Sequence, residues 1–424
     1  MDSNSYLQSA VKKNRSHLIP LMLLLYVLAF LDRSNIGFAK VQYQLDTGLS
    51  DEAFALGAGI FFLVYAFLGT PCNLLMRKIG PKIWISATTV VWGVLSAAMA
   101  IADTEAKFLT IRILLGVAEA GFFPGMIYLC ASWFPQSVRA GVTGLFYLGA
   151  PLALTLGAPL SGALLDMHGF LGHPGWFWMF VIEGAIAVLV GFFAYAYLDD
   201  TPEKARFLTA EEKQALRAEL DSEEKTVQTS NFKDIFTNAK VWHFAAIYFI
   251  IQMAVYGMVF FLPSQVAAIL GTSVGFKASL LIAIPWIASL IGTYYIPHFS
   301  DRKNERRVTA AVTLLLAALG IGSSALLASP ALAIFALCFA AIGVIAVQPV
   351  FWTMPTMVLS GAALAGGIGF INMFGAFGGF IAPIIRVYAE KAADSASAGL
   401  LTLSAITIVG VVLILMIKKP NQQN

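Results

Sequence analysis

Long apolar stretches separated by short polar segments run through almost the whole chain of 424 residues. Each stretch has about 20 residues or more, which is the length that a helix needs to cross the hydrocarbon core of a bilayer. The pattern predicts an all-α integral membrane protein with twelve transmembrane helices, over residues 18–40, 53–76, 83–102, 108–134, 138–165, 176–198, 241–270, 275–299, 308–328, 331–358, 361–388 and 397–417.

The composition agrees with this pattern and excludes a soluble enzyme. Hydrophobic residues make up 58% of the chain and charged residues 12%, whereas soluble proteins have about 25% charged residues. The first apolar run is long enough to span, so we expect it to be retained rather than cleaved as a leader. The three cysteines lie in apolar runs without paired spacing, so neither disulfides nor a metal site is predicted.

One long hydrophilic segment, residues 199–240, divides the predicted spans six and six. The pattern therefore indicates an N-terminal six-helix half (1–198), a linker (199–240) and a C-terminal six-helix half (241–424). Within the linker, Thr209 and Glu212 fit a capping box at the start of a short helix that carries Leu216 and Leu220. We expect this helix to lie solvated on the membrane surface.

The distribution of Lys and Arg predicts which side of the membrane the termini occupy. If both termini lie on one side, that side receives the basic clusters at residues 12–15, 77–82, 139, 204–240, 302–307 and 418–419. The opposite side receives Lys40, Lys107, Lys277, Arg386 and Lys391. Because Lys and Arg accumulate in cytoplasmic loops, both termini are expected in the cytoplasm.

Two loops at equivalent places in the two halves resemble each other. The loop after the second span carries Asn73 and Arg77, and the loop after the eighth span carries Asp301 and Arg302, each within a basic cluster. Such an internal repeat is typical of transporters that bind their ligand between two halves. We assign these four residues a structural or gating role.

The repeated basic loop resembles the loop signature of the major facilitator superfamily, although Asn73 stands where many members carry Asp. Four further segments resemble the anion:cation symporter family of that superfamily: FLDRSNIG at 30–37, Arg112 followed by EAGFFPG at 119–125, FVIEG at 180–184 and FWTMP at 351–355. The sequences of these segments are similar to those of bacterial sugar-acid carriers, such as those for L-rhamnonate and D-galactonate. The resemblance implies proton-coupled uptake of a small organic anion across a bacterial inner membrane, by alternating access, in a monomer without cofactor.

Charged residues inside the apolar spans are the candidates for this chemistry, because a charge at membrane depth is costly and needs a partner. Asp32 and Arg33 lie side by side late in the first apolar run, and Arg112 and Glu119 lie two helical turns apart on one face of the fourth span. A plainer alternative is that the first helix ends just before Asp32, which would leave the first pair among the lipid headgroups.

We assign Glu119 as the main proton-coupling group, and Asp32 as a second proton carrier or as the group that restrains Arg33. Arg33 and Arg112 would hold the substrate carboxylate, because a guanidinium binds a carboxylate through two parallel hydrogen bonds. Alternatively, one of them holds Asp32 in the empty carrier. A fixed salt-bridge network that only ties the first and fourth spans together remains a further interpretation.

The remaining candidates are neutral, apart from Glu183 in the sixth span. The resemblance places that span at the periphery, so we expect Glu183 to have a structural hydrogen-bonding role. It also places Tyr65, Trp352 and Asn372 at ligand-contacting positions. Gln252 and Tyr256, four residues apart on one face of the seventh span, are further candidates for binding substrate hydroxyl groups.

Two other functions remain to be weighed. A facilitator or exchanger of related carboxylates would use Glu119 for conformational locking rather than for proton coupling. A membrane-embedded enzyme is disfavoured, because the five histidines all lie at span ends or in loops and no phosphate-binding loop is present.

Overall fold

Twelve helices of the computed structural model are long and apolar enough to cross a membrane, which confirms the predicted fold class. The structure describes residues 3–224, 237–358 and 361–417. The helices of the N-terminal half are α1 (Ser3–Thr47), α2 (Asp51–Ile79), α3 (Pro81–Ala98), α4 (Glu105–Glu119), α5 (Phe122–Trp133), α6 (Gln136–Tyr147), α7 (Gly149–Leu165) and α8 (Gly175–Tyr197). Those of the C-terminal half are α11 (Ala239–Val259), α12 (Leu262–Leu270), α13 (Phe276–Lys303), α14 (Arg306–Ser324), α15 (Pro330–Val358), α16 (Gly361–Ala392) and α17 (Ala396–Leu415).

The first helix extends well past the acid–base pair in its middle. It runs without interruption from Ser3 to Thr47, so Asp32 and Arg33 lie inside α1 and both are buried. The alternative that this helix ends before Asp32 is therefore wrong. The charged pair belongs to the interior of the bundle.

Three predicted spans are each divided into two helices, and proline explains all three breaks. A proline has no N–H to donate to the carbonyl four residues earlier, and its ring clashes with that carbonyl. Pro124 leaves the carbonyl of Ala120 without this partner, just after α4 ends. In the same way Pro151 interrupts the helix at the end of α6, and Pro263 at the end of α11. The prediction of one continuous helix over 241–270 is therefore wrong.

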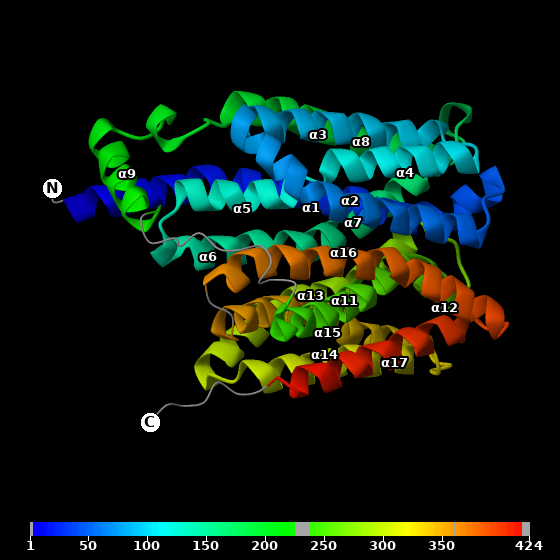
Figure 1. The fold of residues 1–424 in the computed structure, drawn as a ribbon. Helices are drawn as coiled ribbons and strands as arrows, with labels where there is room; N and C mark the ends of the chain where they lie inside the picture. The colour runs from blue at the N-terminus through cyan, green and yellow to red at the C-terminus, as the bar shows by residue number, and fades with distance from the viewer. Residues whose placement is uncertain (1–2, 225–236, 359–360, 418–424) are drawn as a thin grey trace.

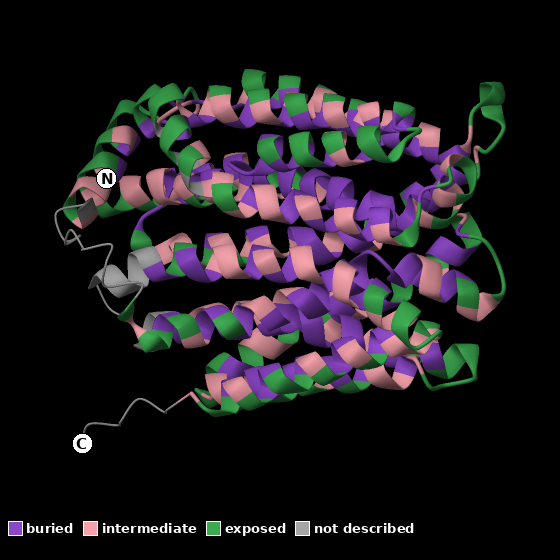
Figure 2. Cartoon of the chain, turned by 45° about the vertical axis from the view of Figure 1, so that its right-hand side comes forward, coloured by how far each residue is buried: buried purple, intermediate pink, exposed green. Residues whose placement is uncertain are grey.

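The two halves lie beside each other, and both chain termini lie at the same end of the bundle (Figure 1). We call this the terminal end and the opposite one, which contains α12, the far end. At the far end the halves touch directly: Lys391 of α16 pairs with Glu52 of α2, and the Asp166 carboxylate accepts a hydrogen bond from the Phe276 backbone N–H at 2.9 Å. Buried residues concentrate between the helices, and exposed ones on the outer surfaces (Figure 2).

The predicted capping box is confirmed at the start of α9 (Ala210–Glu224). The Thr209 N–H donates to the Glu212 carboxylate at 2.9 Å, and the Glu212 N–H donates to the Thr209 hydroxyl at 3.4 Å. The helix is not simply solvated, however, because Leu216 is fully buried and Glu212 accepts hydrogen bonds from Ser9 and Lys13 of α1. The linker helix is thus fastened to the N-terminal half; residues 225–236 of the linker lie outside the described residues.

Candidate functional site

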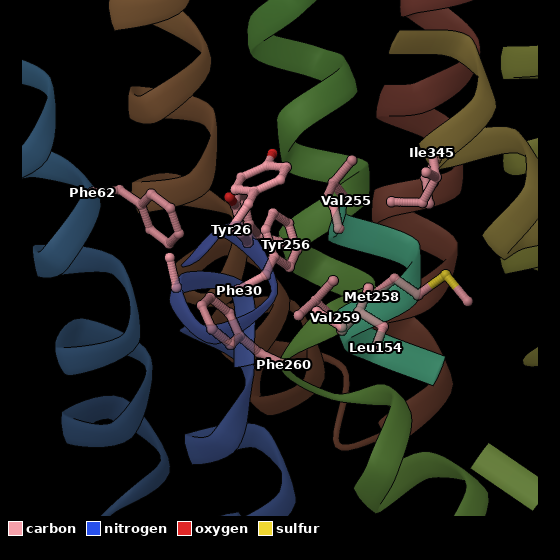
Figure 3. Packing of buried hydrophobic residues seen from close by; sticks show 14 of the residues in the cluster. Tyr26, Phe30, Phe62, Leu154, Val255, Tyr256, Met258, Val259, Phe260 and Ile345 are labelled. Atoms are coloured by element: carbon pink, nitrogen blue, oxygen red, sulfur yellow. The ribbon is translucent and has the colours of Figure 1, made fainter. Parts of the chain in front are cut away.

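A cavity lies between the two halves of the bundle. Its volume is about 60 Å³, which is room for a few water molecules and less than a small-ligand site usually has, so a ligand would enter only when the halves move apart. Its wall is made mainly of aromatic and neutral polar side chains: Tyr26, Phe30, Arg33, Phe62, Tyr65, Phe123, Tyr147, Ala150, Tyr248, Gln252, Val255, Tyr256, Thr293, Ile345, Gln348, Pro349, Asn372 and Ala376. Tyr26, Phe30 and Phe62 of the N-terminal half lie opposite Val255 and Tyr256 of the C-terminal half (Figure 3).

Arg33 supplies the cationic side chain of the described cavity wall. Its Nε donates to the Glu119 carboxylate at 2.7 Å, and its guanidinium carbon lies 5.0 Å from the centre of the Tyr65 ring. One terminal nitrogen, Nη2, is buried and has no hydrogen-bond partner among the described residues. The guanidinium group is thus only partly satisfied and lies where a ligand in the cavity could reach it.

Glu119 owes its position to the helix break described above. It is the last residue of α4 and is completely buried, with Oε2 bound to Arg33. The other oxygen, Oε1, has no donor among the described residues, and neither has Oδ2 of Asp32. The Asp32 side chain is within hydrogen-bonding reach of the Glu119 and Ser96 side chains. The two carboxyl groups repel each other when both are ionised, and the charges of Arg33 and Arg112 offset part of that repulsion.

Arg112 lies behind the cavity rather than in its wall. It is fully buried, its Nε donates to the Gly57 carbonyl at 3.0 Å, and both Nη groups have no hydrogen-bond partner among the described residues. Both guanidinium groups lie near the Phe61 ring, with the carbon of Arg33 5.5 Å and that of Arg112 5.0 Å from its centre. Arg112 is close enough to interact electrostatically with Asp32 and Glu119. Its predicted contact with substrate stays a prediction.

The C-terminal half contributes neutral hydrogen-bonding groups to the cavity. Gln252 donates to the Tyr248 hydroxyl at 2.8 Å, while its own Oε1 is buried without a donor among the described residues. Tyr256 packs on Phe62 of the other half, with 4.1 Å between ring centres. Asn372 also lies in the wall, whereas Trp352 lies behind it and packs against Tyr248 at 4.8 Å.

Glu183 lies away from the cavity, and the structural role expected for it stays a prediction. Its carboxyl oxygens accept hydrogen bonds from Asn35 of α1 at 3.2 Å and from Ser161 of α7 at 2.8 Å. The group is buried, and no Lys or Arg of the described chain forms an ion pair with it. Glu183 thus joins three helices of the N-terminal half.

The candidate loop residues lie at the terminal end. Asp301 forms an ion pair with Arg306, and Arg302 is exposed in the last turn of α13. The side chains of Asn73 and Arg77 lie outside the described part of the structure. Their predicted gating roles stay predictions.

Sequence reasoning missed several residues of the wall. Thr293 and Gln348 are polar residues inside apolar runs, a signal that could have identified them. Tyr26, Tyr147 and Tyr248 gave no such signal, because a tyrosine in a span can equally face lipid, packing or cavity. The rotation of each helix about its axis decides which of these three surroundings a tyrosine side chain faces.

Known proteins resemble this chain along nearly its whole length. The sequence model of the Major Facilitator Superfamily matches residues 22–383. The inner membrane transport protein RhmT of Escherichia coli (strain K12) is 66% identical over 416 residues, which cover 98% of this chain and 97% of that protein. A putative tartrate transporter of Agrobacterium vitis is 37% identical over 411 residues, 96% of this chain and 91% of that protein. A solved structure of a bacterial homologue of the human lysosomal transporter Spinster, described as inward-facing and occupied, covers 95% of this chain and 96% of its own, with a TM-score of 0.76 at 17% identity.

Proposed function

The chain belongs to the major facilitator superfamily and is a membrane transporter, and we propose that it is a proton-coupled symporter of a small organic anion. The anion is a sugar acid such as L-rhamnonate, and it moves by alternating access of the central cavity. The similarity to RhmT and to putative tartrate transporters supports an organic anion as the transported species.

The observation that carries the proposal is the chain of contacts from the cavity to the buried carboxyl groups. Arg33 reaches both the cavity and Glu119, and Glu119 lies beside Asp32. In the empty carrier at high pH, the ionised Glu119 competes with any substrate carboxylate for the guanidinium group of Arg33. Once Glu119 accepts a proton, the competition ends and the substrate carboxylate binds Arg33 in its place.

This competition couples the anion to the proton. A charge-assisted hydrogen bond contributes about 1.5–3 kcal/mol, so releasing Arg33 from Glu119 changes the affinity for an anion substantially. The bound anion and the proton together add no net charge to the buried site. A loaded carrier therefore avoids the cost of moving an uncompensated charge through the membrane interior.

The wall of the cavity favours a ligand with one carboxylate and several hydroxyl groups. Arg33 lies on the N-terminal side, and the C-terminal side offers Gln252, Gln348, Asn372 and Thr293, which are neutral donors and acceptors. A dicarboxylate such as tartrate would place its second charge against this neutral side. We therefore infer that a monocarboxylic aldonate fits better than tartrate.

The proposed setting is a bacterial inner membrane, with the terminal end in the cytoplasm and one chain as the working unit. The bias of Lys and Arg toward the terminal end supports this orientation. The two halves, residues 1–198 and 241–424, would rock about the cavity. Asn73, Arg77, Asp301 and Arg302, which were predicted in loops but lie in the last turns of α2 and α13, would hold the helices together at the terminal end.

Uptake into proteoliposomes tests the proposal. A panel of labelled aldonates, including L-rhamnonate and D-galactonate, is supplied with and without an inward proton gradient. We expect accumulation above equilibrium that an uncoupler abolishes, and weak competition by unlabelled tartrate. Entry that only equilibrates and ignores the gradient would instead identify a facilitator or exchanger.

A further inference from the structure

A second buried arginine, Arg386 of α16, lies outside both the cavity wall and the proton-coupling group. Its position near the end of the predicted eleventh span made it resemble a loop residue, but its side chain is only 6% exposed. Nε donates to Glu390 of the same helix at 2.9 Å, and Nη1 donates to the Gly257 backbone carbonyl of α11 at 3.0 Å. The guanidinium carbon lies 4.2 Å from the centre of the Phe261 ring.

The break between α11 and α12 leaves the Gly257 carbonyl without its usual helical donor. In a continuous helix the Phe261 N–H would bind the Gly257 carbonyl, but here it donates to Met258 at 3.1 Å. Arg386 supplies the missing donor, and a cation at the C-terminal end of a helix is favoured by the helix dipole. Arg386 therefore holds the corner formed by Phe260 and Phe261 from the side of its own half.

Three residues of the other half touch the same corner. The Lys40 ammonium lies 5.6 Å from the Phe261 ring centre, and the Phe54 ring meets the Phe261 ring edge-on at 6.2 Å. Phe260 lies directly against Gly37 of α1, where a built Cβ atom would come within 2.7 Å of the Phe260 carbonyl oxygen. The Phe260–Phe261 corner thus contacts both α1 and α2, and it follows the cavity residues Val255 and Tyr256 along the chain toward α12.

We propose that Phe260 and Phe261 form the gate that closes the cavity toward the far end, and that Arg386 is the residue that positions this gate. Arg386 and Phe261 belong to the same half, so their contact persists when the far end opens. Lys40 and Phe54 belong to the other half, so their contacts with Phe261 break. Arg386 keeps the corner in one shape, and Lys40 and Phe54 hold it shut. This inference rests on the alternating access in the proposed function, but not on the identity of the ligand or on protons.

Cysteine accessibility tests the gate without substrate or gradient. Cys72, Cys130 and Cys338 are replaced, and Val255→Cys in the cavity wall serves as reporter for a membrane-impermeant thiol reagent. Thr272→Cys, exposed at the far end, identifies the membrane face from which the far end is reached. The reagent is then applied to that face or to the opposite one, in vesicles of both orientations.

Arg386→Gln and Phe261→Leu are expected to raise the labelling rate from the far end by about tenfold, because each removes a buried cation–π contact. Labelling from the terminal end should fall, since the carrier spends less time closed at the far end. Phe261→Leu keeps the proposal testable if Arg386→Gln does not fold. Lys107→Gln is the matched control for charge, since Lys107 at the far end pairs with Asp103 of its own half.

Two results would overturn the gate. One is an unchanged rate from the far end in both variants. The other is an equal increase from both ends, which would indicate a general loosening of the bundle rather than a shift between two closed states.

Discussion

Replacing Glu119 with Gln should separate anion binding from proton coupling. The substitution keeps the size of the side chain but removes the charge that holds Arg33 through its 2.7 Å ion pair. That buried charge-assisted hydrogen bond is worth about 1.5–3 kcal/mol, or about tenfold to a hundredfold in an equilibrium constant. The variant should therefore bind L-rhamnonate more tightly than the parent at alkaline pH, by up to about that factor.

Binding and uptake, measured on the same preparation, check this prediction. Ligand binding to purified protein is titrated across a pH series: the dissociation constant of the parent should rise with pH, and that of Glu119→Gln should stay flat. Proton-driven accumulation should be lost in the variant, while exchange of internal for external rhamnonate continues. A variant that still accumulates rhamnonate against its gradient would refute the assignment of Glu119. Glu183→Gln is the matched control, because it makes the same chemical change in the same half but away from the cavity.

Substitutions at three further positions test other parts of the account. Arg33→Lys should weaken rhamnonate binding by about tenfold or more, because an ammonium group cannot bind a carboxylate through two parallel hydrogen bonds; equilibrium titration measures it. Glu183→Gln should keep transport, since an amide can still bond Asn35 and Ser161, whereas Glu183→Ala should lower thermal stability by about 1–3 kcal/mol, seen as a reduced melting temperature. Burial raises the pKa of Glu212, but hydrogen bonds from Lys13 and Ser9 outweigh burial and leave that pKa below the ordinary value of a glutamate. This stabilisation of α9 is therefore present above the unfolded pKa and lost as the pH falls through the folded pKa. Glu212→Gln should raise the rate of backbone amide hydrogen exchange in α9 several-fold at neutral pH. An unchanged rate would contradict the attachment of α9 to α1 through Glu212.

The number and order of the helices could be predicted from the sequence, but their interruptions could not. Pro124, Pro151 and Pro263 coincide with breaks, whereas Pro20 and Pro71 lie inside continuous helices. A proline removes the same hydrogen bond in every case. At the Pro263 break, Arg386 donates to the Gly257 carbonyl, which the Phe261 N–H no longer binds.

The charged part of the site could also be predicted, because a charge within an apolar span is a strong signal. Arg33 and Glu119 pair as members of one network, and Asp32 lies beside them. A charge within an apolar span does not show which way its side chain points. The pattern therefore predicts Arg112 among the ligand contacts, whereas in the structure its guanidinium group lies against Phe61 and outside the cavity wall. Near a span end the signal fails altogether. Arg386 was counted among the loop charges, but it is a buried residue of α16.

Proton movement driven by the substrate gradient alone tests the central claim most directly. Proteoliposomes that contain a pH-sensitive dye, with equal pH on both sides and no membrane potential, receive external L-rhamnonate. The account predicts that the vesicle interior becomes acidic with the parent protein and does not with Glu119→Gln. Labelled rhamnonate should still exchange across the membrane with either protein. Entry of rhamnonate through the parent protein without acidification would contradict the shared use of Arg33 by the anion and the proton-coupling carboxylate.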